Sequence, residues 1–567
     1  MEVSPLVRSF LAKRGIESDD HIKAFLNPDY ECGTHDPYLL AGMDRAVARL
    51  LSAIGGGERI AVYADFDCDG IPGAALLSDF FKKIGYENFE VYLPHRDREG
   101  YGFHADAIAR LADRGVALII TVDVGTTALE AVDLAKEKGV DVIVTDHHEI
   151  PAVLPAALAI LNPKIEGYPF PNLCGAAVAF KLAHATLIEG RRRKLAAFRE
   201  VPLGWEKWLL DLVAIATVAD MVPLVGENRV LAHWGLKVLR KSPRRGIRAL
   251  VAKLRLRQAE LTEDDIGFSL APRINAASRM DEPDLALKLL TTQDTSEAHA
   301  LAAKLESLNA SRKGVVAGVV KEARKHVLAR FSPEERVVVV GSPAWKPALL
   351  GLAANSIMSE RGGVVCLWGR DANGKLKGSC RSDGDVPLPK LFADAGDIFE
   401  ESGGHEKSGG FSVSHERVHM LPDVLKAAFG RIAESQALQN MEGLTFHKAA
   451  VHESDARLTL SDVSRELFAD VSRLSPFGIG NPKPRFLIGS CIVTDVRRFG
   501  REKGHTEVML ECRASGISVR AFEFFKSPED FTHVPERGSQ ADVVATLERD
   551  PFRGGLVLRI VDIVPAA

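Results

Sequence analysis

The sequence predicts an α/β protein. Its expected parts are a doubly wound parallel sheet, a long connecting helix, a second α/β domain and a small C-terminal β-barrel. Three observations support this. In the first third of the chain, apolar runs alternate with helical patterns. Residues 293–330 form an Ala-rich stretch without proline. From about residue 445 onward, short β-rich segments are separated by polar turns.

The parallel sheet is predicted from five apolar runs. Continuous apolar runs between helices are typical of parallel strands that are buried on both faces, and repeated βα units imply a doubly wound sheet. The runs are RIAVYADF (59–66), FEVYLP (89–94), ALIITVDV (117–124), DVIVTDHH (141–148) and ALAILNP (157–163).

The remaining boundaries follow in chain order. A helical, polar-flanked segment occupies residues 1–55, and the domain with the parallel sheet occupies 56–285. Residues 286–332 are the connecting helix. A second α/β domain covers 333–435 and begins with ERVVVVGS. Five or so strands in 445–567 suggest a barrel of the oligonucleotide-binding (OB) type.

Composition limits the class of protein. A length of 567 residues suggests three or four domains, and 46% hydrophobic with 26% charged residues is ordinary for a soluble globular chain. The net charge of −4 argues against a uniformly basic nucleic-acid coat but permits a local basic groove. There is no signal-peptide core and no apolar run long enough to span a membrane. We expect a cytoplasmic protein without membrane contact.

The cysteines suggest a reducing compartment. No CxxC pair occurs, which argues against a thiolate zinc site and against a disulfide framework. The seven cysteines are Cys32, Cys68, Cys174, Cys366, Cys380, Cys491 and Cys512.

Acids and histidines follow several of the apolar runs. In open α/β sheets, ligands bind beyond the carboxyl ends of the strands. Converging carboxylates repel one another unless a cation neutralises them, and oxygen ligands with imidazole suit manganese, or less comfortably magnesium. The sequence therefore predicts a metal site from Asp65, Asp67, Asp69, Asp123, Asp146, His147, His148 and Asp220.

Each piece also has a simpler interpretation. A lone Asp after a strand is more often a helix N-cap than a ligand, and His148 alone could be a loop histidine. The DxDxDG pattern could be a calcium loop, but Leu76 stands where that loop needs glutamate. The joint occurrence of four acidic sites, each ending an apolar segment, favours the interpretation as a metal site.

The chain resembles the DHH phosphoesterase superfamily, and within it most closely the bacterial single-stranded-DNA exonucleases. The likeness covers nearly all of residues 55–567, in the family's order. YADFDCDG, TVDVGTT, VTDHHE and ATVADMVPL resemble the four DHH motifs. Further similar segments are PHRDREGYGF (94–103), FSLAPRINAASRM (268–280), GKLKGSCRSDG (374–384), SGGHEKSGGF (402–411) and LSPFGIGNPKPRF (474–486), of which the third and fourth resemble the associated DHHA1 domain.

The resemblance implies roles for individual residues. Asp67, Asp69, Asp123, His147 and Asp220 would hold two divalent cations, Mn²⁺ or Mg²⁺, with Asp65 as a further ligand or support; Asp146 and His148 would be catalytic, orienting ligands or contacting the scissile phosphate. Phosphodiester hydrolysis would then be of the two-metal type. The substrate-binding set would be Arg96, Arg273, Asn275, Arg279, Ser379, Arg381, Ser382, Gly403, Gly404 and His405.

Alternatives remain for parts of this set. SGGH taken alone is an ordinary tight turn, and the arginines of APRINAASRM could equally be a structural salt-bridge element. The chain also departs from the family pattern: Cys68 replaces an alanine, Ser278 a glycine, and Lys346, followed by Pro347, a histidine.

Two further features suggest contacts with nucleic acid. Residues 237–257 contain nine Lys or Arg and no acid, which usually means a solvated helix face but could steer DNA. The barrel carries basic and aromatic positions that could hold a single strand by stacking, although several of these aromatics are expected in the barrel core. They are Arg497, Arg498, Phe499, Phe522, Phe524 and Phe525.

The function implied by the resemblance is a metal-dependent 5′→3′ exonuclease that releases 5′ mononucleotides from single-stranded DNA, in DNA repair and recombination. The alternatives are a DHH phosphodiesterase acting on short oligoribonucleotides or cyclic dinucleotides, and a non-catalytic DHH scaffold of a replication complex. A helicase and a single-strand-binding protein are plausible partners, and a monomer is expected.

Overall fold

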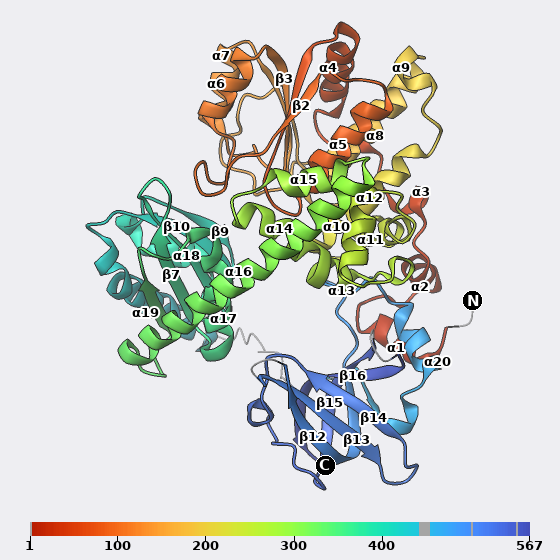
Figure 1. Cartoon of the computed structure of the whole chain (residues 1–567), viewed down its shortest axis with the longest axis vertical. Helices are drawn as coiled ribbons and strands as arrows, with labels where there is room; N and C mark the ends of the chain where they lie inside the picture. The colour runs from red at the N-terminus through yellow and green to blue at the C-terminus, as the bar shows by residue number, and fades with distance from the viewer. Residues whose placement is uncertain (1–2, 442–453, 501–502, 551–553, 567) are drawn as a thin grey trace. The chain divides into compact units, whose positions relative to one another are not determined.

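The computed structural model describes residues 3–441, 454–500, 503–550 and 554–566 (Figure 1). The chain divides into two compact units. One comprises residues 1–34, 223–233 and 446–567, and the other comprises 35–222 and 234–445. The predicted first residue of the barrel domain, 445, lies outside the described residues.

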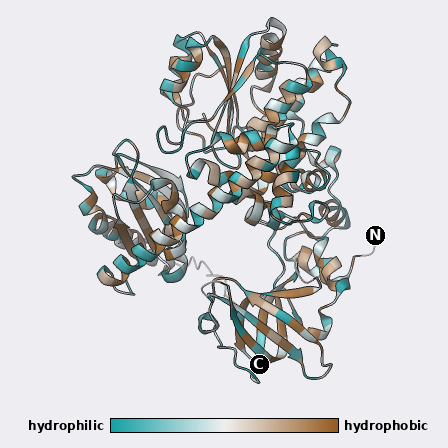
Figure 2. Cartoon of the chain, viewed as in Figure 1, coloured by the Kyte–Doolittle hydropathy of each residue, from teal (hydrophilic) through white to brown (hydrophobic). Residues whose placement is uncertain are grey.

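The larger unit contains the predicted parallel sheet. All neighbouring strands run parallel in the order β2-β1-β3-β4-β5, which confirms the doubly wound fold class. Figure 2 shows the apolar strands in brown between helices of mixed colour. The strands are β1 (Arg59–Ala64), β2 (Phe89–Tyr92), β3 (Val116–Val122), β4 (Asp141–Thr145) and β5 (Ala159–Leu161).

Helices cover both faces of this sheet. On one face, α6 (Ala105–Asp113) and α7 (Leu129–Glu137) bury apolar side chains against the strands. On the other, α4 (Met43–Gly56), α5 (Gly70–Lys83) and α8 (Gly175–Arg192) pack together.

A helical region follows the sheet and leads into the connector. A π-helical turn, Ile266–Leu270, continues directly into α14 (Ala271–Arg279). The connecting helix is α16 (Thr295–Arg330), and its 36 residues agree with the predicted long helix. The other helices here are α9 (Ala196–Arg199), α10 (Leu210–Ala219), α11 (Gly226–Leu239), α12 (Arg245–Lys253), α13 (Glu263–Asp265) and α15 (Asp284–Thr291).

The second α/β domain is built on a mixed sheet of order β6-β7-β8-β10-β9. Only β6 and β7 are parallel. Helix α17 (Pro347–Arg361) and the end of α16 pack on one face, while α18 (Leu388–Asp394) and α19 (Leu421–Met441) pack on the other. The strands are β6 (Val337–Gly341), β7 (Val364–Arg370), β8 (Leu376–Ser382), β9 (Glu401–His405) and β10 (Ser408–Val413).

One disulfide corrects the expectation drawn from the scattered cysteines. Cys366 on β7 and Cys380 on β8 lie directly opposite each other and are bonded. Their separation of 14 residues is not a recognisable motif, so only the register of the two strands reveals the pair. The other five cysteines are free.

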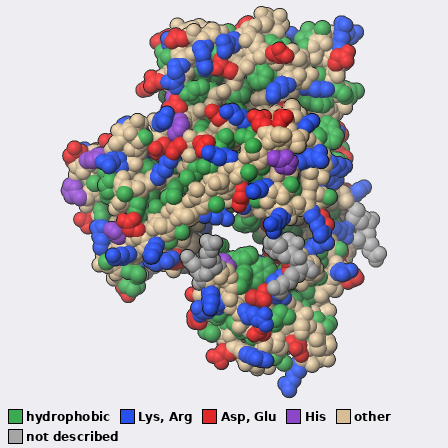
Figure 3. Space-filling model, in the orientation of Figure 1, with side chains coloured by type: hydrophobic (Ala, Val, Ile, Leu, Met, Phe, Trp, Pro, Cys, Tyr) green, Lys and Arg blue, Asp and Glu red, His purple; other side chains and the backbone are tan. Residues whose placement is uncertain are grey.

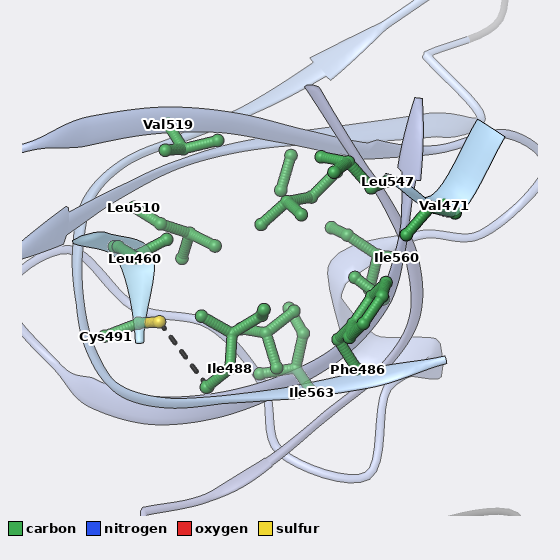
Figure 4. Close-up of a cluster of buried hydrophobic side chains, with 14 of the residues drawn as sticks. Leu460, Val471, Phe486, Ile488, Cys491, Leu510, Val519, Leu547, Ile560 and Ile563 are labelled. Carbon is green, nitrogen blue, oxygen red and sulfur yellow. Dashed lines mark hydrogen bonds between the residues drawn. The ribbon is translucent and has the colours of Figure 1, made fainter. Parts of the chain in front are cut away.

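The smaller unit contains the predicted barrel. Strands pair in the order β12-β13-β14-β16-β15, and β15 pairs again with β12, which closes the barrel. Phe486, Ile488, Leu510 and Ile560 fill its interior (Figure 4). The strands are β11 (Ala456–Leu458), β12 (Phe486–Phe499), β13 (His505–Cys512), β14 (Ser518–Glu523), β15 (Gln540–Arg549) and β16 (Leu556–Pro565).

N-terminal helices complete this core. Phe10 of α1 meets Phe486 edge-on, with ring centroids 5.8 Å apart, and Ile22 of α2 joins the same apolar cluster. The helices of the unit are α1 (Pro5–Ala12), α2 (Asp19–Leu26), α3 (Tyr30–Gly33) and α20 (Arg465–Ser472).

The backbone carbonyls of the segment LSPFGIGNPKPRF (474–486) accept several side-chain hydrogen bonds within the smaller unit. Asn481 donates to the carbonyls of Leu474 and Pro476, both at 2.8 Å. Arg229 donates to the carbonyls of Leu474 and Ser475, at 3.0 and 2.9 Å. Because these bonds satisfy consecutive buried carbonyls, the segment fixes 223–233 against the barrel.

The barrel aromatics differ from the expectation that several belong to the core. Phe499 and Phe522 are half-buried, and Phe524 and Phe525 are exposed, the latter by 87%. The interior is filled by aliphatic residues and Phe486 instead. These four rings therefore lie on the surface of the barrel.

Charges are mixed over the visible surface. Figure 3 shows basic and acidic side chains interspersed on the face drawn, as a net charge of −4 suggests. None of the helices in the described part of the chain has both the length and the apolar character needed to cross a membrane.

Candidate metal centre

The predicted acids gather at one edge of the parallel sheet. Asp65 follows β1, Asp123 follows β3 and Asp146 follows β4, and these three strands are neighbours. Asp220 reaches the same place from the carboxyl end of helix α10. The fold thus brings together residues that are up to 155 positions apart in the chain.

His147 lies at the centre of this group. Its Nε2 is 3.1 Å from Oδ1 of Asp123 and 3.7 Å from Oδ2 of both Asp69 and Asp220. Three overlapping sets of side chains have ligand atoms within 4.8 Å of one another and could hold metal ions. They are Asp65, Asp67 and Asp123; Asp69, His147 and Asp220; and Asp123, His147 and His148.

Burial makes these carboxylates costly without a cation. Burial, and then the neighbouring carboxylates, raises the pKa of Asp69 to about 7 and of Asp220 to about 9. The pKa of Asp123, which is 3% exposed, is raised well above its usual value for the same reasons. Oδ1 atoms of Asp65 and Asp123 have no hydrogen-bond partner within the described residues. The donor set therefore fits divalent cations.

Burial, together with the nearby charge of His148, lowers the pKa of His147 to about 3. The imidazole of His147 is therefore neutral at ordinary pH, which is the form that binds metals.

Two glycines, Gly70 and Gly175, allow the backbone to pack closely against the acids. Backbone N–H groups of Gly175 and Ala176, at the start of α8, donate to the carboxylate of Asp69 at 2.6 and 2.7 Å. A Cβ on Gly175 would lie 2.6 Å from Cβ of Asp123, and one on Gly70 would lie 2.3 Å from the carbonyl oxygen of Asp65. No larger residue fits at either position.

Asp146 supports the motif rather than extending the cluster. Its Oδ1 accepts from Nδ1 of His148 at 2.7 Å, and its Oδ2 accepts from the backbone N–H of Thr126 at 2.9 Å. Burial opposes ionisation, but these bonds prevail and hold the pKa of Asp146 below its usual value. Burial likewise opposes the charge on His148, but Asp146 and further acids raise its pKa. The protonated form of His148 is thus favoured beside the acids.

Two contributors were not predicted. Tyr101 places its hydroxyl 3.2 Å from Nε2 of His148. Asn162 donates to the carbonyl of His148 at 2.9 Å and to the hydroxyl of Thr126 at 3.1 Å. Asn162 follows β5, so the rule that singled out polar residues at strand ends could have found it.

Two of the predicted substrate-binding arginines, Arg96 and Arg279, interact with the acids, and Arg381 interacts with Arg279. The Arg96 guanidinium stacks 4.7 Å from the ring centroid of Phe66 and interacts electrostatically with Asp65. Burial, and then the charge of Arg96, lowers the pKa of Arg279 to about 9, and Arg381 of β8 acts in the same direction. The three arginines therefore share one electrostatic environment.

The other predicted residues have varied surroundings. Arg273 pairs with Glu306 at 2.8 Å, which matches the salt-bridge alternative. Ser382 donates to the carbonyl of Val386 at 2.9 Å, within its own turn. Asn275 and Ser379 are half-buried, and Gly403, Gly404 and His405 lie on exposed β9.

His405 interacts electrostatically with His148 of the DHH motif. Partial burial, and then the charges of His148 and Lys164, lowers the pKa of His405. The second domain therefore contributes to the electrostatics of the metal centre.

The structure shows the contacts or burial of the residues that depart from the family pattern. Lys346 forms an ion pair with Asp281, which follows α14, so it links the second domain to the first. Cys68 and Ser278 are buried and fit without displacing an acid.

The basic stretch 237–257 is partly structural. Arg244 is largely buried and pairs with Asp79 and with Asp211, the latter at 2.8 Å. Arg245 and Arg248 line an open cavity of about 630 Å³.

Comparisons with known proteins agree with this architecture. Residues 59–217 match the DHH family, N-terminal domain; residues 334–434 match the DHHA1 domain; and residues 454–562 match the RecJ OB domain. The fold and the acid cluster thus define a DHH-superfamily protein.

Relatives that match nearly the whole chain show which family of the DHH superfamily it belongs to. A single-stranded-DNA-specific exonuclease RecJ from Haemophilus influenzae is 31% identical over 96% of this chain and 92% of its own. The chain belongs to the RecJ family. The RecJ of Bacillus subtilis is 35% identical over 92% of this chain, which spans only 63% of that relative's length.

Solved structures agree with the fold and the donor set. The crystal structure of RecJ in complex with Mn²⁺ from Thermus thermophilus has a TM-score of 0.77 and 27% identity, covering 100% of this chain and 76% of its own. A structure of RecJ from the same organism in complex with Mg²⁺ has a TM-score of 0.72. Both metals suit the oxygen-rich donors described above.

Proposed function

We propose that this protein is a 5′→3′ exonuclease that releases 5′ mononucleotides from single-stranded DNA with two divalent cations, Mn²⁺ or Mg²⁺. The observation that carries this proposal is the convergence of Asp69, Asp123 and Asp220 on His147 at the edge of the sheet. The single-strand preference comes from the names of the relatives.

The chain's own residues supply the setting for hydrolysis. When bound, the two cations would activate a water and stabilise the leaving oxygen. Asp67, Asp69, Asp123, His147 and Asp220 would hold them, with Asp65 in support. His148, oriented by Asp146, can donate to a phosphate oxygen.

Arginines supply the second part of the substrate site. Arg96 and Arg279 lie beside the acids and Arg381 interacts with Arg279, and guanidinium groups bind phosphate through paired hydrogen bonds. We assign these three to substrate phosphates. Asn275, Ser379, Gly403, Gly404 and His405 are further contact positions in this proposal, whereas Arg273 and Ser382 act mainly within their own structural contacts.

The barrel would hold the strand outside the metal centre. His505 lies among Phe499, Phe524 and Phe525 at centroid distances of 5.1, 5.3 and 4.9 Å, and the Arg559 guanidinium lies 4.3 Å from the Phe524 centroid. Exposed rings next to a cation suit base stacking and phosphate attraction.

The cellular setting forms part of the same proposal. A single-strand exonuclease would act in DNA repair and recombination, in the cytoplasm, as a monomer. A helicase and a single-strand-binding protein would supply and present its substrate.

The test is degradation of labelled oligonucleotides. With Mn²⁺, the purified chain should release mononucleotides from 5′-labelled single-stranded DNA, act far more slowly on duplex and RNA, and give no early product from a 3′ label. His147→Ala should be inactive, while Asp133→Asn, on the exposed face of α7, should match wild type.

The same assay separates the alternatives. Preference for oligoribonucleotides of two to five residues, or for cyclic dinucleotides, would replace the proposal with a different phosphodiesterase. A chain that degrades no substrate, yet binds single strands, would fit the non-catalytic scaffold.

A further inference from the structure

One helix face leads away from the metal centre. The π-helical turn and α14 form one continuous helix, which buries Leu270, Ile274 and Ala277. Phe268, Pro272, Asn275 and Arg279 follow spacings of four, three and four residues, so they lie on one side of it. All four are at least partly exposed.

Arg279 fixes one end of that face. Its Nη1 donates to the carbonyl of Ala348 at 2.8 Å, and its charge interacts with Asp67 and Arg96. This end of the helix therefore lies at the metal centre.

Phe268 lies at the other end of this face, in a turn whose backbone is anchored. The side chain is 78% exposed. Arg273 donates to the carbonyl of Ser269 at 3.1 Å and pairs with Glu306 of α16 at 2.8 Å, which anchors the π-helical turn. Such turns occur often at functional sites. Exposing a phenylalanine on an anchored turn sacrifices its burial and leaves its ring available to a ligand.

The helix sets the spacing between the two ends. Eleven residues at about 1.5 Å each place Phe268 about 16 Å from Arg279 along the axis. At about 3.4 Å per stacked nucleotide, this corresponds to about five nucleotides, and to fewer in an extended strand.

We propose that Phe268 is a stacking platform for a nucleobase of the bound single strand, about five nucleotides or fewer from the metal centre. The inference rests on the proposed function, because it takes a single strand as the ligand. Phe268 is a positioning residue: it contacts the strand without touching the reacting phosphate. It should strengthen the binding of strands long enough to reach it and leave the chemistry of the bound 5′ end unchanged.

Length dependence is the first test. For a 12-nucleotide strand, Phe268→Ala should raise KM on the order of tenfold without changing kcat, since one base stack is lost. For a dinucleotide it should change neither constant. Phe268→Trp should retain wild-type KM. Leu328→Ala, at an equally exposed apolar position of α16 (76% exposed), is the matched control and should behave as wild type.

A binding measurement that needs no hydrolysis completes the test. In EDTA, the extra fluorescence of Phe268→Trp over wild type should be quenched by oligo-dT of 12 nucleotides and not by a dinucleotide. Equal KM values for wild type and Phe268→Ala at every length, or absence of quenching, would overturn the inference. Failure of the proposed function looks different: the wild-type chain would then degrade no single-stranded DNA, while the quenching result would still decide whether Phe268 contacts a strand.

Discussion

Nδ1 of His148 lies 2.7 Å from Oδ1 of Asp146, while the other oxygen of that carboxylate accepts the backbone N–H of Thr126 at 2.9 Å. One buried carboxylate thus orients the final histidine of the motif and the loop after β3 together. It also explains why Asp146 is ionised although the acids around it favour their protonated forms.

Asp146→Asn removes the negative charge of this side chain while keeping its size. The amide oxygen can still accept from Thr126, so folding should be retained, but Nδ1 of His148 loses its carboxylate partner. We expect kcat on 5′-labelled strands to fall by about 10–100-fold, as is typical when a supporting group of a metal site is changed. Thermal unfolding provides the control: a large loss of Tm would mean that Asp146 acts through folding instead.

Removal of metal should destabilise the protein. Close, buried carboxylates repel each other without cations, so Mn²⁺ should raise Tm by several degrees and EDTA should reverse the change. Asp123→Asn should raise the Tm of the metal-free protein, because it removes a buried carboxyl group that is costly to ionise there, and should abolish most of the Mn²⁺ effect. Equal Tm values with Mn²⁺ and with EDTA would contradict the assignment of these acids.

Adjacent glycines of the second domain should respond differently to substitution. A Cβ on Gly404 (φ +146°) would lie 2.3 Å from the carbonyl oxygen of Ser408, whereas one on Gly403 would meet no atom within 4 Å. Gly404→Ala should therefore lower the free energy of unfolding by more than about 1 kcal/mol. Gly403→Ala should fold as wild type and raise KM, if strand phosphate approaches there. Urea unfolding and steady-state kinetics of both variants distinguish the two effects.

The sequence was most informative where polar residues interrupt apolar runs. Five strands, the 36-residue connector and the closed barrel follow periodicity, which local residues encode. The acids at the strand ends could be predicted because parallel strands share one edge. Asp220 came from its position after another apolar segment and from the family resemblance, and the structure places it at the end of a helix.

Other features depend on contacts between distant residues. Nothing near Cys366 or Cys380 indicates that their strands pair in register. The pairing of Arg273 with Glu306 joins two helices and is visible only in three dimensions. Several of the barrel aromatics are expected in the core, yet aliphatic side chains and Phe486 already fill the interior.

Two cysteines should differ in reactivity with pH. Hydrogen bonds from Ser515, and from backbone N–H groups including that of Ala514, lower the pKa of Cys512 to about 7. The carboxylate of Asp29 raises the pKa of exposed Cys32. Since the thiolate is the reactive form, Cys512 should be alkylated by iodoacetamide well below about pH 8 and Cys32 only above about pH 9. Mass spectrometry of peptides across a pH series measures both, and Cys32 reacting first would contradict the prediction.

Removing the exposed rings of the barrel should weaken binding of single strands by the full-length chain. Phe525 is 87% exposed, and Phe524 lies under the Arg559 guanidinium at 4.3 Å. The double substitution Phe524→Ala and Phe525→Ala should cost about 1–3 kcal/mol for each base stack lost. Arg559→Gln should instead flatten the dependence of log Kd on log salt by about one ion. Ile517→Ala, at an exposed turn between β13 and β14, is the matched control and should leave Kd unchanged. If the double variant and Arg559→Gln both bind a 30-nucleotide strand as tightly as wild type at every salt concentration, this face of the barrel does not contact the strand.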